Sequence, residues 1–277
     1  MFIVVAHPRD RVAAEAAAAL AARVGAAGVA LLGVEELALA ARWTHVQEDG
    51  QTRTVVRLPG GRAIDSEAVS GVVNRIRRVV APRFRRQNDS EYGTMELFAL
   101  LLSWLAGLSC RVVNPPSPRG LGGDERTVPQ WLRLAGAAGL PTRRVRMTTD
   151  GRRFFASDLT VHPASASGWA VGEALHPSVP VDARPALFVE PVSDPRRVTV
   201  VGEAVFGAPS AEWVEGCRRL ARSARCELLE LTIARRTHAP AEWLVSGANP
   251  LPEALTASEL EALADLLAGA RVRTEAR

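Results

Sequence analysis

The most unusual absence in this chain is lysine, because every one of its 34 basic residues is arginine. Lysine is the compact point charge that proteins commonly place on nucleotide phosphates, so a phosphate site of that type is excluded. Alanine-rich helices accompany the bias, which favours a GC-rich genome as its cause ahead of selection for nucleic acid. The net charge of +4 still admits an anionic partner.

Cysteines and long apolar runs are also scarce. The three cysteines, Cys110, Cys217 and Cys226, are an odd number without metal-ligand spacing, which argues against a disulfide framework or a zinc site. No apolar run reaches the roughly 18 residues of a membrane span, and the N-terminus lacks the features of a signal peptide. We therefore expect a cytoplasmic protein.

The first residues show the alternation of an α/β protein. An apolar run at Phe2–Ala6, an alanine-rich helix at Asp10–Ala26 and an apolar run at Val29–Gly33 indicate strand, helix and strand. This order predicts a doubly wound N-terminal domain with a ligand crevice at the carboxyl ends of its strands. His7 ends the first strand, where it could face the crevice or be a structural histidine. The pair Asp49-Gly50 predicts a hairpin between two short strands.

The rest of the chain continues with strands, helices and one candidate linker. The proline- and glycine-rich stretch 115–123 indicates a boundary, which divides the chain into a domain 1–116, a linker and helix 117–141, and a domain 142–277. The spacing of Ser258 and Glu261 is that of a capping box. We predict strands at 72–80, 110–113, 143–148, 152–156, 186–192, 197–201, 204–206, 227–233 and 243–246, and helices at 91–108, 124–139, 211–224 and 258–267.

Three segments resemble one family in the same order. They are WLAGLSCRVVNPP with the following DERTVPQWLRLAGAAGL and PTRRVRMTTDG, then VEPVSDPRRVTVVGEAVFGA, and then CELLELTIARRTHAPAEWLVSGANPLP. The chain is similar to ATP-grasp ligases, above all the graspetide or microviridin type that matures ribosomal peptides. The resemblance implies an α/β fold with a pre-ATP-grasp-like doubly wound N-terminal domain, followed by a reduced, shortened ATP-grasp-like α+β region between Thr148 and the C-terminus.

Such ligases phosphorylate a carboxylate with ATP, and they hold the phosphates with lysines and magnesium with an Asp, a Glu and an Asn. The resemblance places Arg126 where the linker-helix lysine would be, and Gly247 at an acidic position. The strand of the first acidic ligand reads Leu-Thr-Ile-Ala at 231–234, with Glu230 nearby but expected on the wrong register or face. Asn249 alone matches. Glu230 and Asn249 are therefore weak metal candidates.

Arg197 matches the arginine that, in the family, contacts the reacting phosphate and carboxylate. It is the one candidate catalytic residue, and it could equally be an exposed strand arginine. Asn249, which precedes a proline, could likewise be an ordinary turn residue.

A second candidate site is a basic cluster that includes three nucleotide- or anion-binding candidates, Arg75, Arg77 and Arg78. Guanidinium groups pair well with carboxylates and phosphates, so the cluster could hold an acidic peptide. It could also be a solvated face, and nucleic acid is disfavoured because few aromatic residues accompany it. The other members of the cluster are Arg83, Arg85 and Arg86.

Two functional hypotheses follow from the resemblance and its departures. The first is an ATP-grasp-like protein with a degraded nucleotide and magnesium site, which works as a non-catalytic, peptide-binding or regulatory partner in a ribosomal-peptide pathway. The second is an active ATP-dependent ligase that uses arginines in place of lysines, and only this one requires ATP and Mg²⁺. The expected partners are a precursor peptide or a full-length ATP-grasp enzyme, and a homo-oligomer stays open.

Overall fold

The computed structural model describes residues 1–79, 84–148, 159–163 and 186–274, and these form two compact units. The first unit contains residues 1–124, 225–228 and 250–277, and the second contains residues 125–224 and 229–249. The C-terminal helix thus lies in the first unit, whereas the sequence-based ranges place it in the second domain. Those ranges stay a prediction.

The first unit is built on a parallel sheet with the strand order β2-β1-β6-β7. Val4 of β1 is paired with Leu31 on one side and with Val73 on the other. All five residues of β1 are buried, as expected for a parallel strand that is covered on both faces. The strands are β1 Phe2–Ala6, β2 Val29–Gly33, β6 Gly71–Arg75 and β7 Arg111–Val113.

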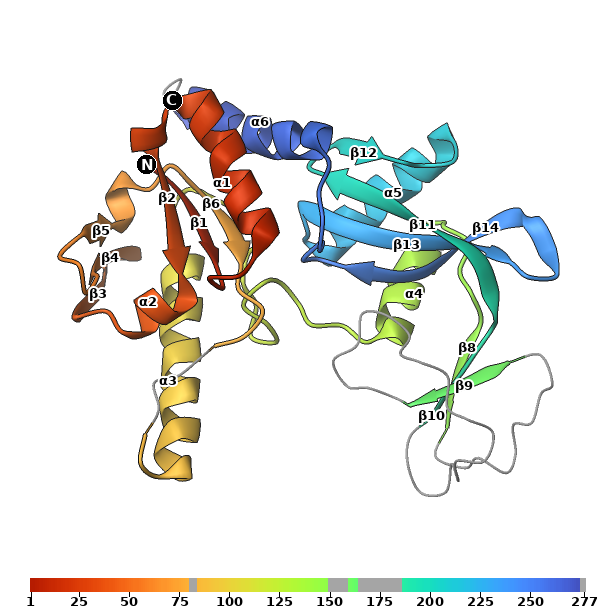
Figure 1. The fold of residues 1–277 in the computed structure, drawn as a ribbon, viewed down its shortest axis with the longest axis horizontal. Helices are drawn as coiled ribbons and strands as arrows, with labels where there is room; N and C mark the ends of the chain where they lie inside the picture. Colours follow the sequence, from red (N-terminus) through yellow and green to blue (C-terminus); the bar gives the residue numbers. More distant parts are fainter. Residues whose placement is uncertain (80–83, 149–158, 164–185, 275–277) are drawn as a thin grey trace. The chain divides into compact units, whose positions relative to one another are not determined.

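Helices cover both faces of this sheet, which confirms the doubly wound prediction (Figure 1). Helices α1 (Arg11–Val24) and α6 (Ala257–Thr274) pack together on one face, and α3 (Gln87–Ala106) packs on the other. Helix α1 begins where the Asp10 side chain accepts a hydrogen bond from the Ala13 N–H. The shorter helices are α2 Val34–Ala38 and the 3-10 turns Ala26–Gly28 and Ser66–Ala68.

A small antiparallel sheet completes the first unit. Its strands are β3 (Arg42–Glu48), β4 (Gln51–Arg57) and β5 (Ala63–Asp65), in the order β3-β4-β5. Asp49 and Gly50 both have positive φ, at 51° and 76°, which is the backbone of a type I′ hairpin turn. The predicted hairpin is therefore confirmed.

Two local predictions in this unit are wrong. The strand expected at 72–80 stops at Arg75, because its register partner Ala6 is the last residue of β1 and no ladder partner follows. The capping box of the last helix is formed by Thr256 and Glu259, whose side chains and N–H groups bond reciprocally, and not by Ser258 and Glu261.

The second unit contains two antiparallel sheets and two helices (Figure 1). One sheet has the order β8-β10-β9, and the other has the order β12-β11-β13-β14 with α4 and α5 packed against it. The predicted strand 152–156 lies outside the described residues, as does most of the predicted short lobe. The elements are α4 Val128–Ala137, β8 Val145–Thr148, β9 Thr160–Pro163, β10 Ala186–Val189, β11 Val192–Val201, β12 Ala204–Phe206, α5 Ala211–Ala224, β13 Leu228–Arg236 and β14 Ala239–Asn249.

Together these units form a mixed α/β fold of parallel and antiparallel sheets. No helix within the described ranges combines the length and the apolar character that crossing a membrane requires. The three cysteines are free thiols.

Candidate functional site

The last two strands of the second unit bring the candidate metal residues together. Glu230 of β13 is the direct cross-strand partner of Asn249 of β14, and Thr232 is the partner of Gly247. Direct partners in an antiparallel pair share a face of the sheet, and so do residues two apart on one strand. These four positions therefore form one patch on one face. Glu230 was expected on the wrong register or face, but the structure places it on the face of Asn249.

Arg197 extends this patch from the neighbouring strand β11. Its Nη1 atom lies 3.9 Å from Oε2 of Glu230, and the two side chains are 31% and 19% exposed. Thr199, two residues further along β11, is fully buried, and its hydroxyl has no hydrogen-bond partner among the described residues. We call Arg197, Thr199, Glu230, Thr232, Gly247 and Asn249 the sheet-face site.

Alternation along the strands explains why these side chains share a face. Val198, Val200, Leu231 and Ile233 are fully buried, and they are interleaved with the residues of the sheet-face site. Burying the aliphatic residues of each strand leaves the intervening polar residues on the other face. The apolar pattern of the sequence therefore aims Arg197 and Glu230 at the same side.

The donor set of the sheet-face site does not fit magnesium. Mg²⁺ is usually held through one or two carboxylates, phosphate oxygens and water. Here Glu230 supplies one carboxylate that is paired with Arg197, while Thr232 and Gly247 face each other without any acidic group. Within the ranges that the structure describes, no group of three or more His, Cys, Asp or Glu residues is arranged to hold a metal ion.

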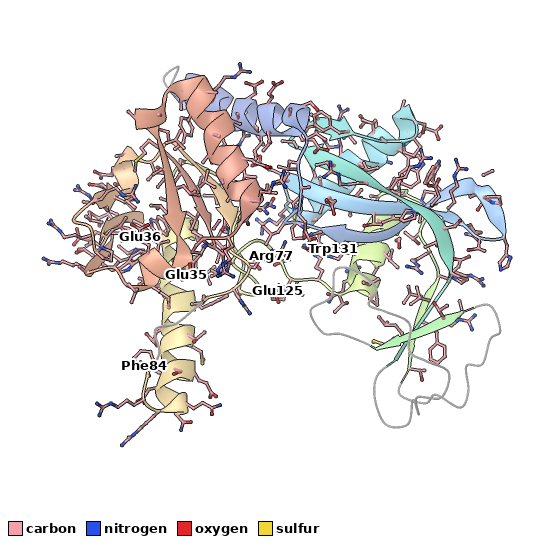
Figure 2. All side chains as sticks on the ribbon, viewed as in Figure 1. Glu35, Glu36, Arg77, Phe84, Glu125 and Trp131 are labelled. Atoms are coloured by element: carbon pink, nitrogen blue, oxygen red, sulfur yellow. The ribbon has the colours of Figure 1, made fainter. Side chains whose placement is uncertain are left out.

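Arg126 lies just before α4 in the second unit and is half-buried. Its guanidinium carbon is 5.0 Å from the ring centre of Trp131, which Figure 2 labels on α4. This geometry is a cation–π contact, which stabilises a guanidinium over an indole face. The nucleotide role of Arg126 stays a prediction. Helix α4 starts at Val128, later than predicted, because Thr127 and Gln130 form its capping box.

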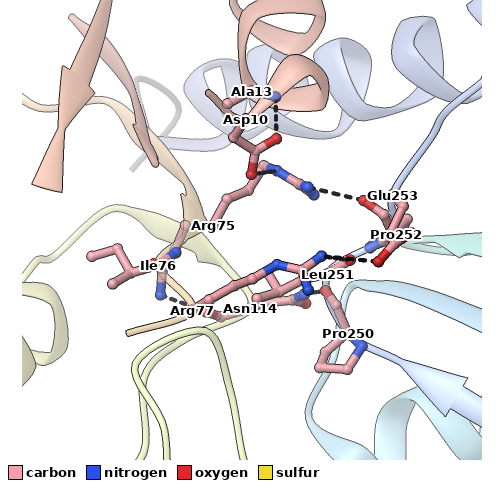
Figure 3. Close-up of polar contacts among 11 residues, drawn as sticks. Asp10, Ala13, Arg75, Ile76, Arg77, Asn114, Pro250, Leu251, Pro252 and Glu253 are labelled. Atoms are coloured by element: carbon pink, nitrogen blue, oxygen red, sulfur yellow. Dashed lines mark hydrogen bonds and ion pairs between the residues drawn. The ribbon is translucent and has the colours of Figure 1, made fainter. Parts of the chain in front are cut away.

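The arginine cluster of the first unit is divided between buried and exposed members (Figure 3). Arg75 is 2% exposed; its Nε donates to Asp10 at 2.9 Å and its Nη2 donates to the Pro252 carbonyl at 2.9 Å. Arg77 donates to the Leu251 carbonyl at 3.1 Å. These two contacts join the segment after β14 to the end of β6.

The remaining cluster members differ from those two. Arg78, Arg85 and Arg86 are exposed, and Arg83 lies outside the described residues. An exposed arginine remains available to an anion, whereas the guanidinium of Arg75 is held by internal partners. Anion binding by Arg75, Arg77 and Arg78 stays a prediction.

A buried carboxylate that the sequence did not single out organises the second unit. Glu190 is 3% exposed, and its Oε2 accepts the Arg144 N–H at 2.9 Å. Its Oε1 lies 3.5 Å from Arg236. Arg143 donates to the Glu190 carbonyl and to Ser246, and burial lowers the pKa of the Arg143 guanidinium to about 10. The available signal was one acid at the end of the apolar run ALFVE.

Comparisons with known proteins identify the fold. No protein-family model and no curated protein matches the sequence. The macrocyclase MdnC of Microcystis aeruginosa MRC, bound with its precursor peptide MdnA, superimposes with a TM-score of 0.77, 15% identity and 97% coverage of this chain and 99% of that chain.

Two further structures are similar over nearly the whole length. A Chryseobacterium gregarium RiPP-associated ATP-grasp ligase, in complex with ADP and a leader and core peptide, gives a TM-score of 0.72, 14% identity and coverages of 97% and 96%. The ATP-grasp ligase PsnB gives 0.71, 21% and 97% of each chain. The chain therefore has an ATP-grasp fold of the graspetide type.

Proposed function

We propose that this protein has a degraded nucleotide and magnesium site and works as a non-catalytic, peptide-binding or regulatory partner in a ribosomal-peptide ligase pathway. One observation carries the proposal: Thr232 and Gly247 face each other on the sheet-face site, and the one nearby carboxylate, Glu230, is paired with Arg197.

The physical reason concerns charge. ATP-grasp chemistry transfers a phosphoryl group, and metal ions must bridge the phosphate oxygens and neutralise their charge. A hydroxyl and a glycine provide no anionic ligand, and the guanidinium of Arg197 offsets the charge of Glu230 further. With no lysine in the chain, the phosphates would also lack their usual point charges.

The peptide part of the proposal rests on the fold. The similar structures of MdnC and of the Chryseobacterium ligase hold precursor or leader and core peptides. A protein that keeps such a scaffold while its metal ligands are absent can still bind a peptide. Its partner would then be a precursor peptide or a full-length ATP-grasp enzyme of the same pathway.

Calorimetry with ATP and Mg²⁺ tests the loss of the nucleotide site. We expect no saturable binding at micromolar concentrations, and metal-dependent micromolar binding would overturn the proposal. A gain-of-function variant sharpens the test. Thr232→Asp with Gly247→Glu should introduce binding of Mn²⁺ or Mg²⁺, because the two positions are cross-strand partners. The matched neutral variant, Thr232→Asn with Gly247→Gln, should not.

The peptide part needs its own measurement. A fluorescently labelled precursor peptide encoded beside this gene should raise the anisotropy on addition of the protein without ATP. Equal signals with a scrambled peptide of the same composition would contradict specific recognition.

A second candidate is an active carboxylate-activating ligase, and the placement of Glu230 opposite Asn249 beside Arg197 favours it. It predicts ADP release in the presence of the precursor peptide. Arg197→Ala should abolish that release. Arg196→Ala is the matched control, because Arg196 is the adjacent exposed arginine and contacts Asp194 and Trp243 instead. Equal losses in both variants would count against a role for Arg197.

A further inference from the structure

Strand β3 leaves one edge of the small sheet unpaired. Within the described residues β3 pairs with β4 alone, and β4 separates it from β5 (Figure 1). The strand is seven residues long and contains neither proline nor glycine, and its ladder with β4 runs without a bulge. Natural edge strands are usually shortened, bulged or otherwise blocked against pairing with another chain. This one has none of those three features.

The two faces of β3 differ in character. Trp43 and His45 point toward α3, since Trp43 packs edge-on against Trp104 and His45 hydrogen-bonds Ser103 at 2.9 Å. The alternate residues form the other face of the strand, and Val46 among them is 40% exposed. This outer face consists of Arg42, Thr44, Val46 and Glu48.

The charges of the outer face are incompletely matched within one chain. Arg42 lies directly opposite Arg57 of β4, and Glu48 lies opposite Gln51. Like charges directly opposite each other destabilise a sheet. Among the described residues, no ion pair is formed by Arg42, Arg57 or Glu48. A negative group on the open side of Arg42 would relieve this repulsion.

We propose that the open edge of β3 pairs with β3 of a second copy of this chain, antiparallel and centred on His45. In this register Arg42 meets Glu48 of the second copy at both ends, and Thr44 meets Val46 of the second copy. Every such pair joins residues of the same parity, so outward N–H and C=O groups meet whichever alternate set faces outward. The two small sheets then form one continuous sheet, with roughly six to eight new backbone hydrogen bonds.

The size of this contact sets the expected affinity. Stable interfaces commonly bury about 1,200–2,000 Å² in total, and pairing of one short strand falls below that range. The dimer should therefore dissociate at micromolar concentrations. Each cross-strand charge pair contributes modestly, and the two-fold symmetry makes every substitution count twice.

Charge reversal tests the register. Sedimentation velocity over about 1–200 µM should show a concentration-dependent dimer. Arg42→Glu alone and Glu48→Arg alone should each raise its dissociation constant roughly ten- to fifty-fold, because two attractive pairs become repulsive. The double variant Arg42→Glu with Glu48→Arg should return to within about threefold of the wild type. A monomeric wild type, or a double variant as weak as the singles, would overturn the proposal.

Two further measurements keep the test independent of folding. Circular dichroism should show unchanged melting of Arg42→Glu, or a small gain, because the repulsion with Arg57 is removed in the monomer. The double variant Thr44→Cys with Val46→Cys should form a disulfide-linked dimer under mild oxidation, while the wild type with its native cysteines should not. Crosslinking that is absent while the dimer persists would show another interface and would refute this one.

Discussion

The buried ion pair between Asp10 and Arg75 should contribute much of the stability of the first unit. Asp10 has two roles, because one oxygen caps α1 through the Ala13 N–H at 3.0 Å and the other accepts from Arg75 at 2.9 Å. The two side chains are 12% and 2% exposed. Burial lowers the pKa of the Arg75 guanidinium, and the hydrogen bond to Asp10 opposes that shift. Truncation of Asp10 would leave this buried guanidinium without its carboxylate.

The magnitude follows from the two roles. Loss of an N-cap costs about 1 kcal/mol, and removing one partner of a buried ion pair costs about 3–5 kcal/mol. Nη1 of Arg75 is already buried without a hydrogen-bond partner among the described residues, so little relaxation is available. Asp10→Ala should therefore lower the free energy of unfolding by about 4 kcal/mol or more. At roughly 2–4 °C per kcal/mol, the melting temperature should fall by about 10 °C.

Thermal melting followed by circular dichroism is the assay, with Asp10→Asn as the separating variant. Asparagine caps a helix as well as aspartate does but carries no charge, so Asp10→Asn should retain the cap and lose about 3 kcal/mol from the pair. Glu15→Ala is the surface control, because the Arg11–Glu15 pair is exposed, and we expect no measurable change. If Asp10→Asn melts like the wild type while Asp10→Ala loses only the cap, the assigned role of the ion pair is refuted.

Three further outcomes are expected. Thr256→Ala should lower stability by about 1 kcal/mol while Ser258→Ala should not, in chemical denaturation, and the reverse order would place the cap at Ser258. Burial raises the pKa of Glu227 despite Arg111, so the folded state favours the protonated acid. The stability of the wild type should therefore fall relative to Glu227→Gln as pH rises from about 4 to 6, and a gain would contradict the sign. Burial raises the pKa of Cys217 to about 11, so iodoacetamide at neutral pH should modify it only after unfolding; prompt labelling of the native protein would contradict this.

Local chemistry made some elements predictable from sequence and left others ambiguous. The Asp49-Gly50 hairpin follows from two residues that tolerate positive φ, so its signal is contained in the turn itself. The last cap is different, because Thr256-x-x-Glu259 and Ser258-x-x-Glu261 have the same spacing. Tertiary burial of Glu259, which is 2% exposed, accompanies the cap that forms. No sequence window of that length contains this information.

The same limit applies to the basic cluster. Arginines between apolar residues in 72–80 read as one basic strand, but the strand ends at Arg75 where β1 ends beside it. The first arginine is consequently buried against Asp10, while Arg78 is exposed. Their different environments depend on the ends of neighbouring strands, which lie far away in the chain.

The register of the candidate site depends on a single bulged residue. Between Thr232 and Ile233 the ladder shifts, so that Thr232 faces Gly247 while Ile233 faces Val245, and Ser246 is the extra residue of β14. Without that extra residue Glu230 would face Ala248, and Asn249 would lie on the opposite face of the sheet. Arg143 donates to the Ser246 hydroxyl at 2.9 Å and so stabilises the bulge from a segment about a hundred residues earlier in sequence. The expected misplacement of Glu230 was therefore a reasonable inference from strand pairing alone, and it fails because a buried arginine elsewhere in the chain contacts the bulge.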